Sequence, residues 1–296
     1  MPPSEIKNEP LSSCTTFRIG GPADRLVTPP DRASLLDTLA TCLRNRTPCF
    51  VLGRGSNVLF SDAGFRGVVI RNTAACNELD YDGETVTAGS SVPLQTFIRF
   101  CHSHGLHGME YLYSVPGNIG GAVVMNAGRG ESYAKAISDH ILSVDVFDGS
   151  KIRTITRDDC GFSYRTSIFQ QMPAWVILGA RFRLPPQDPG VGARNIEERM
   201  AVVREQHDLG FPNAGTIFKK NFVPLPEILG KRIGGAAFSV KTPGWIVNVD
   251  HAKAKDVLAL MAFAQKIHRD KKLPAPIPEV VVVRQGLRER LAAWLR

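Results

Sequence analysis

The feature that most constrains this chain is the glycine-rich stretch at residues 113–128, which reads Y-S-V-P-G-N-I-G-G-A-V-V-M-N-A-G. Glycine lets the main chain approach another group closely, and the N–H groups of such a loop suit an anion or a flat ring. A second glycine loop, residues 53–57 (G-R-G-S-N), directly follows the short apolar run at 49–52. By itself this loop also fits a tight turn between strands, because it lacks the features of a dinucleotide fingerprint or a phosphate-binding P-loop.

The composition indicates a globular protein and narrows the possible ligands. The 296 residues are 43% hydrophobic and 22% charged, enough for one large or two ordinary domains with an ample core. A net charge of +8 favours an anionic ligand such as a nucleotide, whereas no basic stripe with interleaved aromatic residues suggests nucleic acid.

The first ten residues lack the apolar region of a signal peptide, and no apolar run is long enough to cross a membrane. The six cysteines include no C-x-x-C pair and are expected to be reduced thiols of a cytoplasmic protein.

The order of the predicted elements indicates an α+β fold. Helical spacing of apolar residues predicts helices at residues 31–45, 93–104, 195–208, 252–272 and 287–296. Short apolar or alternating runs predict strands at 25–28, 49–52, 58–60, 67–71, 79–81, 85–88, 141–147, 151–156, 175–184, 236–240, 245–249 and 279–284. Residues 185–192 (P-P-Q-D-P-G-V-G) are the clearest linker, and the basic end of the 252–272 helix is expected to cap that helix in solvent.

Three polar residues stand where apolar residues would be expected, and together they make chemical sense. Arg165 lies in S-Y-R-T-S, Thr216 follows a glycine in N-A-G-T-I-F, and Glu279 opens the last predicted strand. An arginine can hold a carboxylate, a hydroxyl beside it can deliver a proton, and a buried glutamate can assist proton transfer. Taken singly, each also fits a surface arginine, a turn hydroxyl or a strand-end carboxylate, and their spacing does not show that they converge.

A group of histidines raises the alternative of a metal site. His102, His104 and His107 follow Cys101 near the end of a predicted helix. Gly105 interrupts the spacing that a helix-borne ligand set requires, and the helix dipole favours histidines at this position. We therefore predict no metal site, and the lack of Ser-His-Asp and H-E-x-x-H patterns argues against hydrolytic and metal chemistry.

Seven motifs, taken in order, give the chain a specific resemblance to one family. They are T-T-F-R-I-G-G-P-A-D (15–24), G-R-G-S-N-V-L (53–59), V-P-G-N-I-G-G-A-V-V-M-N-A-G (115–128), S-Y-R-T-S-I-F (163–169), A-G-T-I-F-K (214–219), R-I-G-G-A (232–236) and P-E-V (278–280). Through these motifs, which extend over nearly the whole chain, it resembles the UDP-N-acetylenolpyruvoylglucosamine reductases, flavoenzymes of peptidoglycan synthesis. Without an obvious tyrosine-loop insertion, it is similar to the compact subclass of that family.

The resemblance implies a two-part architecture. Residues 1–188 would form an FAD-binding domain of the vanillyl-alcohol-oxidase-like type, with subdomains at about 1–72 and 73–188. Residues 193–273 would form a smaller α+β substrate-binding domain, and residues 274–296 would return to the active site as a strand and a helix. The protein would be a cytoplasmic monomer with a small-molecule substrate and with no nucleic-acid or membrane partner.

The resemblance also implies the cofactor chemistry. NADPH would reduce FAD, and hydride would then reach C3 of the enolpyruvyl group of UDP-N-acetylglucosamine enolpyruvate, giving UDP-N-acetylmuramate in a ping-pong order. Arg165 and Glu279 would stabilise the enolate, and Thr216 would protonate C2. The implied cofactor-binding residues are Gly53, Arg54, Gly55, Ser56, Asn57, Val58, Ser114, Pro116, Gly117, Asn118, Gly120, Gly121 and Asn126. The implied substrate-binding residues are Tyr164, Lys219 and Lys220.

The chain departs from the family pattern mainly in its substrate half. Thr216 stands where serine is the usual proton donor, Lys220 stands at a usual asparagine, and Val281 replaces a common arginine. The segment 221–231 is shortened, and the usual S-x-K-H-A reads S-V-K-T-P. Two alternatives therefore stay open: a diverged FAD oxidoreductase acting on another substrate, such as a different nucleotide sugar, and a non-catalytic FAD-binding relative.

Overall fold

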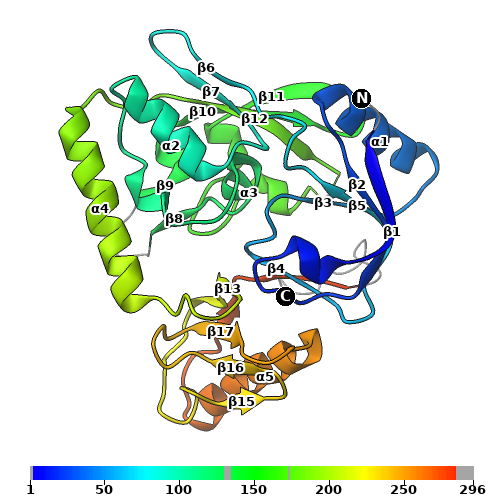
Figure 1. The fold of residues 1–296 in the computed structure, drawn as a ribbon, viewed down its shortest axis with the longest axis vertical. Coiled ribbons are helices and arrows are strands. Elements are labelled where there is room, and N and C mark those ends of the chain that lie inside the picture. The colour runs from blue at the N-terminus through cyan, green and yellow to red at the C-terminus, as the bar shows by residue number, and fades with distance from the viewer. Residues whose placement is uncertain (1–2, 130–134, 173, 285–296) are drawn as a thin grey trace. The chain divides into compact units, whose positions relative to one another are not determined.

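The structure, a computed structural model, describes residues 3–129, 135–172 and 174–284. The helix predicted at 287–296 lies outside these ranges. Contacts between residues divide the chain into two compact units, each built from several stretches. The first unit comprises Met1–Glu5, Val27–Arg54 and Val68–Val203, and the second comprises Ile6–Leu26, Gly55–Gly67 and Arg204–Arg296 (Figure 1). The domain boundaries expected from the resemblance stay a prediction.

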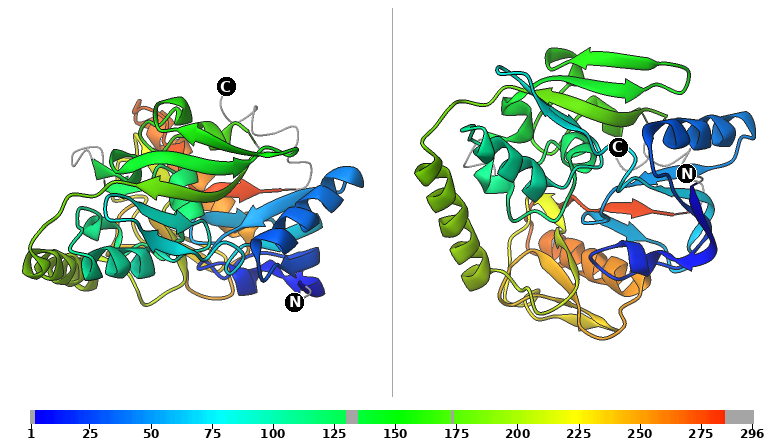
Figure 2. Two further views of the ribbon diagram at one scale, coloured as in Figure 1. Left: turned by 90° about the horizontal axis from the view of Figure 1, so that it is seen from above. Right: turned by 45° about the horizontal axis from the view of Figure 1, so that its top comes forward.

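The first unit is organised around a five-stranded antiparallel sheet. Its order is β11-β10-β12-β7-β6, formed by β6 (Leu79–Tyr81), β7 (Val86–Gly89), β10 (Ile141–Phe147), β11 (Ile152–Thr156) and β12 (Val176–Phe182). Two helices, α2 (Leu94–Ser103) and α3 (Ile119–Val124), pack on this sheet (Figure 1, Figure 2). The predicted hairpins at 79–88 and 141–156 are confirmed, and so is the long strand that begins near residue 175.

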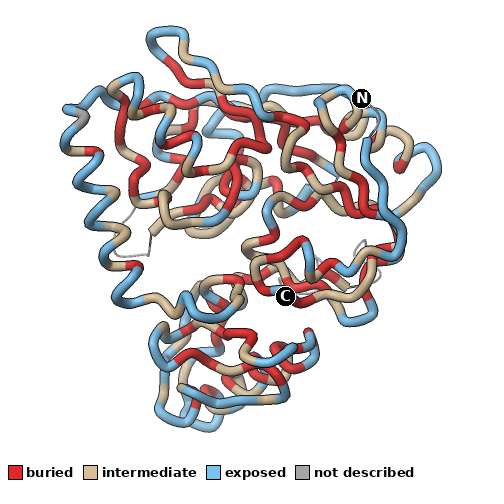
Figure 3. The backbone as a smooth tube through the Cα atoms, viewed as in Figure 1, coloured by how far each residue is buried: buried red, intermediate tan, exposed pale blue. Residues whose placement is uncertain are grey.

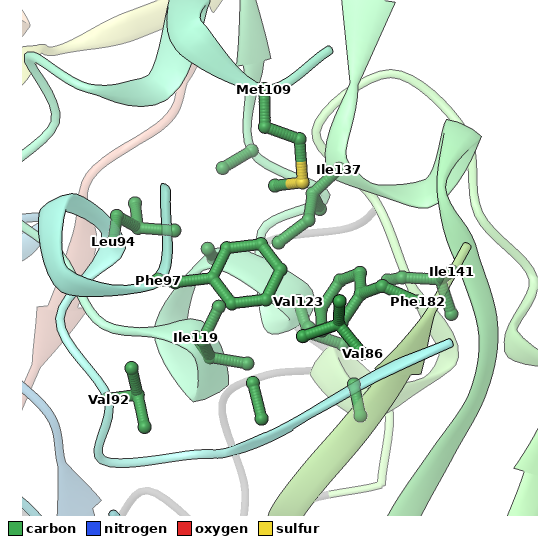
Figure 4. Close-up of a cluster of buried hydrophobic side chains, with 14 of the residues drawn as sticks. Val86, Val92, Leu94, Phe97, Met109, Ile119, Val123, Ile137, Ile141 and Phe182 are labelled. Atoms are coloured by element: carbon green, nitrogen blue, oxygen red, sulfur yellow. The ribbon is translucent and has the colours of Figure 1, made fainter. Parts of the chain in front are cut away.

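The main core of the first unit lies between this sheet and the two helices (Figure 4). Phe97 of α2 and Phe182 of β12 are fully buried, with their ring centroids 4.8 Å apart. Ile119 and Val123 of α3 belong to the same cluster. Burial of each such side chain contributes about 1.5–3 kcal/mol, so packing holds the glycine-rich segment that carries α3 in place.

A second core cluster of the first unit explains the helix predicted at 31–45. α1 (Arg32–Arg44) begins at Asp31, whose carboxylate accepts a hydrogen bond from the Ser34 N–H at 2.8 Å. Leu35 of this helix packs with Ile70 of β5 (Phe65–Arg71). β5 pairs in parallel with β3 (Cys49–Leu52), in a sheet of order β1-β2-β5-β3 that also contains β1 (Ser4–Pro10) and β2 (Pro22–Thr28). The capped helix and the buried strand before the 53–57 loop are confirmed.

The linker predicted at residues 185–192 is partly helical, because α4 (Pro189–Gln206) begins earlier than predicted. The Asp188 carboxylate accepts a hydrogen bond from the Gly190 N–H at 2.7 Å, and proline suits the first position of a helix. Glycine is required at position 192, because a Cβ atom on Gly192 would lie 2.1 Å from His107 Nδ1. Most of the helix beyond this contact is exposed (Figure 3). The helix therefore begins at Pro189, and Gly192 lets it pack against His107. The linker prediction was wrong for residues 189–192.

The second unit contains a four-stranded antiparallel sheet with one long helix packed on it. The sheet has the order β13-β17-β16-β15, formed by β13 (Asn213–Thr216), β15 (Arg232–Ile233), β16 (Ala236–Phe238) and β17 (Trp245–Asn248). The helix, α5 (Ala254–Asp270), contributes the fully buried Val257, Leu260 and Ala264 to the core of this unit. Two further strand pairs belong to the unit: β14 (Phe218–Lys220) with β18 (Ile277–Pro278), and β4 (Val58–Phe60) with β19 (Val281–Val283). The predicted long helix and the strands at 236–240 and 245–249 are confirmed.

The basic end of α5 is exposed at Arg269, Lys271 and Lys272, as predicted, but His268 is fully buried, so the predicted solvent-exposed cap is wrong for His268. Its Nδ1 lies 3.0 Å from the Pro274 carbonyl oxygen, and its Nε2 lies 3.2 Å from the Val223 nitrogen. The ring also stacks with Phe222, at 6.0 Å between centroids. A neutral imidazole with its proton on Nδ1 satisfies both hydrogen bonds, so His268 joins the end of the helix to the shortened segment after Lys220.

The two longest helices, α4 and α5, have 18 and 17 residues. Neither of these, nor any other helix in the described ranges, is long and apolar enough to span a membrane.

Candidate active site

The 53–57 loop connects β3 to β4, and close contacts require its glycines. Gly53 lies against Asn118, where a Cβ atom would be 2.5 Å from the side-chain Oδ1. Gly55 has φ +64°, and a Cβ atom there would lie 2.3 Å from the Cys14 carbonyl oxygen. Within the described part of the chain, the main-chain N–H groups of residues 53–56 donate no hydrogen bond. Such a row of N–H groups in a tight loop forms a donor surface that suits a phosphate.

The 113–128 stretch is not the open loop that we predicted, because residues Ile119–Val124 form α3. Asn118 begins this helix and accepts the Gly121 N–H on its side-chain oxygen at 3.2 Å. The Gly120 N–H donates to the Ser90 carbonyl oxygen at 2.9 Å. The N–H groups of Gly120 and Gly121 thus donate to atoms of the protein itself. The expectation that the N–H groups of this stretch face a ligand is wrong for these two residues.

Two asparagines that the resemblance assigns to cofactor binding hold the first unit together through their side chains. Asn118 is 2% exposed, and its Nδ2 donates to the Asn72 carbonyl oxygen at 3.2 Å. Asn126 Nδ2 donates to the Ser163 carbonyl oxygen at 2.9 Å, and its Oδ1 accepts from the Ser138 N–H at 3.3 Å. Asn126 therefore connects the 113–128 stretch to the S-Y-R-T-S segment.

Arg165 lies at the tip of a tight turn. Ser163 and Thr166 exchange two main-chain hydrogen bonds of 3.1 and 3.0 Å, and Arg165 between them adopts a left-handed conformation with φ +52°. The Gln170 side-chain amide donates to the Arg165 carbonyl oxygen at 3.1 Å. The guanidinium carbon lies 5.6 Å from the centroid of the Tyr164 ring. A non-glycine residue keeps a positive φ only where its surroundings fix it, so the turn presents Arg165 in a defined direction.

Arg165 and Tyr164 line a pocket of about 530 Å³ in the first unit. Of the residues that the structure describes, the other charged ones that line it are Arg129, Lys135, Asp139, Arg157 and Asp158. Because cationic groups outnumber carboxylates in this described lining, the pocket suits an anionic ligand.

In the second unit the structure brings Thr216 and Glu279 together. The Glu279 N–H donates to the Ile217 carbonyl oxygen at 2.7 Å, next to the pairing of β14 with β18. Gly215, with φ +73°, lies at a register shift of β13 immediately before Thr216. Thr216 is exposed, whereas Ile217 is fully buried and fixes the strand in the core. Two predicted catalytic residues from distant parts of the sequence are therefore neighbours in one unit.

The remaining predicted residues divide between the two units. In the second unit, Lys219 and Lys220 lie on β14. In the first unit, Ser114 accepts a hydrogen bond from Arg199 Nε of α4 at 3.0 Å. Burial, together with a nearby arginine, lowers the pKa of Arg199 below its usual value. Arg199 was not predicted, because an arginine on a polar helix gives no local signal of a partner as far along the chain as the half-buried Ser114.

His102, which is half-buried, and the buried His107 and Glu110 form a hydrogen-bonded cluster. One Glu110 oxygen lies 2.8 Å from His102 Nε2 and 3.2 Å from His107 Nδ1. The two rings lie side by side, with centroids 4.3 Å apart, whereas imidazoles that share a metal point their nitrogens at one centre. Burial alone would raise the pKa of Glu110, but hydrogen bonds from main-chain N–H groups and from His102 bring it below its usual value. The Glu110 carboxylate thus holds His102 and His107 in position by hydrogen bonds, whereas we had attributed their position to the helix dipole. The absence of a metal site stays a prediction.

The cysteines are free thiols, five of them buried and one half-buried. Burial raises the pKa of Cys101 and Cys160 to about 12, and it also raises the pKa of Cys76. Thiols with such pKa values stay protonated near neutral pH and are poor nucleophiles.

Comparison with known proteins shows the family to which this chain belongs. Residues 23–152, which include the 53–57 loop and the 113–128 stretch, match a family described as an FAD binding domain. Over 277 residues the chain is 36% identical to the UDP-N-acetylenolpyruvoylglucosamine reductase of Bacillus licheniformis, with 90% of this chain and 89% of that protein covered. The chain belongs to the UDP-N-acetylenolpyruvoylglucosamine reductase family. The reductase of Caldanaerobacter subterraneus is 33% identical over 284 residues, with 93% and 92% covered.

A solved member of this reductase family has the same fold. The UDP-N-acetylenolpyruvylglucosamine reductase of Thermus caldophilus aligns with a TM-score of 0.77 at 28% sequence identity, covering 96% of this chain and 100% of that one. The resemblance found in the sequence motifs and the predicted α+β fold with an FAD-binding domain are therefore confirmed.

Replacing Gly55 of this reductase-family chain by alanine is expected to distort the 53–57 loop. The new Cβ atom would collide with the Cys14 carbonyl oxygen, and the left-handed conformation adds about 1–2 kcal/mol of strain. We expect the free energy of unfolding to fall by about 2–4 kcal/mol and the FAD dissociation constant to rise at least about tenfold. Denaturant unfolding and flavin fluorescence measure the two effects.

The matched control is Gly105→Ala. Gly105 has φ +70° but no atom lies within 4 Å of its added Cβ, so this variant carries the backbone strain without the collision. Equal losses of stability and of FAD affinity in the two variants would contradict the steric account of the loop.

Proposed function

We propose that this protein reduces the enolpyruvyl group of UDP-N-acetylglucosamine enolpyruvate, with FAD as cofactor and NADPH as reductant, to give UDP-N-acetylmuramate. The observation that carries the proposal is the 2.7 Å hydrogen bond between the Glu279 N–H and the Ile217 carbonyl oxygen, which brings the main chain of Glu279 beside the residue that follows Thr216. Relatives 33–36% identical over about nine-tenths of the chain are named UDP-N-acetylenolpyruvoylglucosamine reductases, which supports this substrate.

FAD would be held by the 53–57 loop. The main-chain N–H groups of Gly53, Arg54, Gly55 and Ser56 suit the pyrophosphate, and the lack of a side chain at both glycines leaves room for close approach. Ser114, Pro116 and Gly117 would line the flavin ring. When bound, FAD supplies two-electron transfer from NADPH to carbon C3 of the enolpyruvyl group.

The protein residues would stabilise and protonate the carbon framework. Addition of hydride at C3 leaves an electron pair that is shared between C2 and the carboxylate. The Arg165 guanidinium would bind this carboxylate, and Glu279 in its acid form would polarise it by a hydrogen bond. The Thr216 hydroxyl would give its proton to C2 and regain one from solvent. One hydride and one proton are thus added across the double bond, and NADPH leaves as NADP⁺.

The basic groups next to these residues fit the diphosphate of a nucleotide sugar. Thr216 is the last residue of β13, and Lys219 and Lys220 follow it on β14. Tyr164 directly precedes Arg165. We propose that these three side chains bind the substrate. One chain carries the complete set of proposed residues, so we propose that it acts as a monomer. We also propose that the reaction takes place in the cytoplasm, where NADPH and nucleotide sugars are available.

The test is to incubate the purified yellow protein with NADPH and UDP-N-acetylglucosamine enolpyruvate and to identify the product by mass spectrometry. The proposal expects NADPH consumption that depends on the enolpyruvyl substrate, and a product heavier than that substrate by two hydrogens. NADPH oxidation without consumption of this substrate would move the protein to the diverged-oxidoreductase alternative. In that case the shortened segment after Lys220, where Phe222 stacks on Phe218 and Phe238, is the place to look for a different specificity.

A further inference from the structure

We infer that Asn57 is a positioning residue for Glu279, through which the cofactor loop and the catalytic carboxyl group are held in one arrangement. The inference rests on the proposed function, and it assigns the Asn57 side chain a role other than cofactor contact. It concerns residues of the second unit only.

The main chain at Glu279 is fixed from two sides. The Asn57 side-chain Nδ2 donates to the Glu279 carbonyl oxygen at 3.3 Å, and the Val281 N–H donates to the Asn57 carbonyl oxygen at 3.0 Å. On the other side, the Glu279 N–H donates to the Ile217 carbonyl oxygen at 2.7 Å. Two of these hydrogen bonds, from Asn57 Nδ2 and to the Ile217 carbonyl oxygen, therefore fix the two peptide groups that flank the Glu279 Cα atom, and the third fixes the N–H of Val281 two residues further on.

The strand pairing makes this arrangement rigid. β4 and β19 run in parallel, with Val58 opposite Val281 and Val283 opposite Phe60. Phe60 and Val283 are fully buried, so the register of the pair is fixed by the core. Asn57 is the last residue of the glycine loop and the residue before β4, so a shift of the loop moves the amide that holds Glu279.

This position has a chemical consequence for one half of the reaction. Glu279 is proposed to act on the enolpyruvyl group and not on NADPH, so misplacing it should slow only oxidation of the reduced protein by that substrate. A displacement of about 1 Å in a reacting group can cost about 10²-fold in rate. An FAD-contacting side chain would give a different result, since its loss would weaken cofactor binding and change both halves.

The test uses Asn57→Asp, which keeps the size of the side chain but removes the N–H donor and places a carboxylate against a carbonyl. We expect oxidation of the NADPH-reduced protein by UDP-N-acetylglucosamine enolpyruvate to slow by about 10- to 100-fold. The rate of reduction by NADPH is expected to change by less than about threefold. The added charge is expected to weaken FAD binding in Asn57→Asp, so the FAD dissociation constant is compared in the uncharged Asn57→Leu, where it should change by less than about threefold. Amide hydrogen exchange at Glu279 and Val281, measured without substrate, should become faster. Asn195→Asp, on the exposed face of α4, is the matched charge control and should behave as wild type.

A double-mutant cycle separates positioning from general destabilisation. If Asn57 acts through Glu279, adding Asn57→Asp to Glu279→Gln should cause little further loss of rate. Asn57→Leu, which lacks the donor without adding charge, replaces Asn57→Asp if the latter does not fold. Independent losses that multiply in the double mutant, or a loss of FAD affinity with equal slowing of both halves, would overturn the inference. A wild-type protein that the enolpyruvyl substrate does not oxidise would instead refute the proposed function.

Discussion

Replacing Glu279 by glutamine is expected to slow reduction of the enolpyruvyl group by about 10²- to 10³-fold while the protein stays yellow. Glutamine keeps the shape of the side chain and the main-chain hydrogen bond to Ile217 at 2.7 Å. It cannot act as an acid, however, so it stabilises the charge that develops on the substrate carboxylate much less well. Rapid mixing of the NADPH-reduced variant with substrate measures this step directly.

Two internal controls accompany the Glu279→Gln variant. Its FAD content and its rate of reduction by NADPH should match those of the wild type, because Glu279 has no proposed part in either. Glu205→Gln, at an exposed position of α4, controls for the loss of one carboxylate. Normal turnover by Glu279→Gln would remove this residue from the mechanism and would leave Arg165 and Thr216 to carry it.

Replacing Thr216 by valine is expected to reduce the same half of the reaction by about 10²- to 10⁴-fold. Valine has the shape of threonine and is compatible with β13, so it removes the proton donor with little change in packing. Thr216 is exposed, and its neighbour Ile217 holds the strand in the core, so the variant should fold. Single-turnover oxidation of the reduced protein by substrate is the measurement.

Thr216→Ser is the conservative partner of this variant. Serine keeps the hydroxyl and removes only the methyl group, so its rate should lie within about tenfold of the wild type. A Thr216→Val protein as fast as Thr216→Ser would show that another group, or water, protonates C2.

The sequence predicted those elements whose signal is local. The helix that begins at Asp31 and the strand Cys49–Leu52 were found because a side-chain cap and an apolar run mark them without reference to the rest of the chain. α3 was missed because its six residues, I-G-G-A-V-V, have no polar face to create a periodic pattern. Asn118, which caps it, was the available signal, but it was read as part of a loop.

The residues of the candidate site were predicted from their type and from the motifs, but the sequence did not show which of them lie close together in the fold. The bond between the Glu279 N–H and Ile217 joins strands from distant parts of the chain, and no spacing rule reports such a pair. The hydrogen bond from Asn57 to Glu279 was hidden for the same reason. His268 was misread because charged neighbours suggest solvent, whereas a neutral imidazole with two hydrogen-bond partners can be fully buried.

The most direct test of the proposed reaction is stopped-flow absorbance of the wild-type protein. The flavin is first reduced anaerobically with NADPH and is then mixed with UDP-N-acetylglucosamine enolpyruvate while its absorbance band is followed. We predict rapid return of the oxidised flavin band, faster than in either the Glu279→Gln or the Thr216→Val variant. Reduction by NADPH without return of the band on addition of this substrate would contradict the proposed reaction and would support a diverged flavin oxidoreductase.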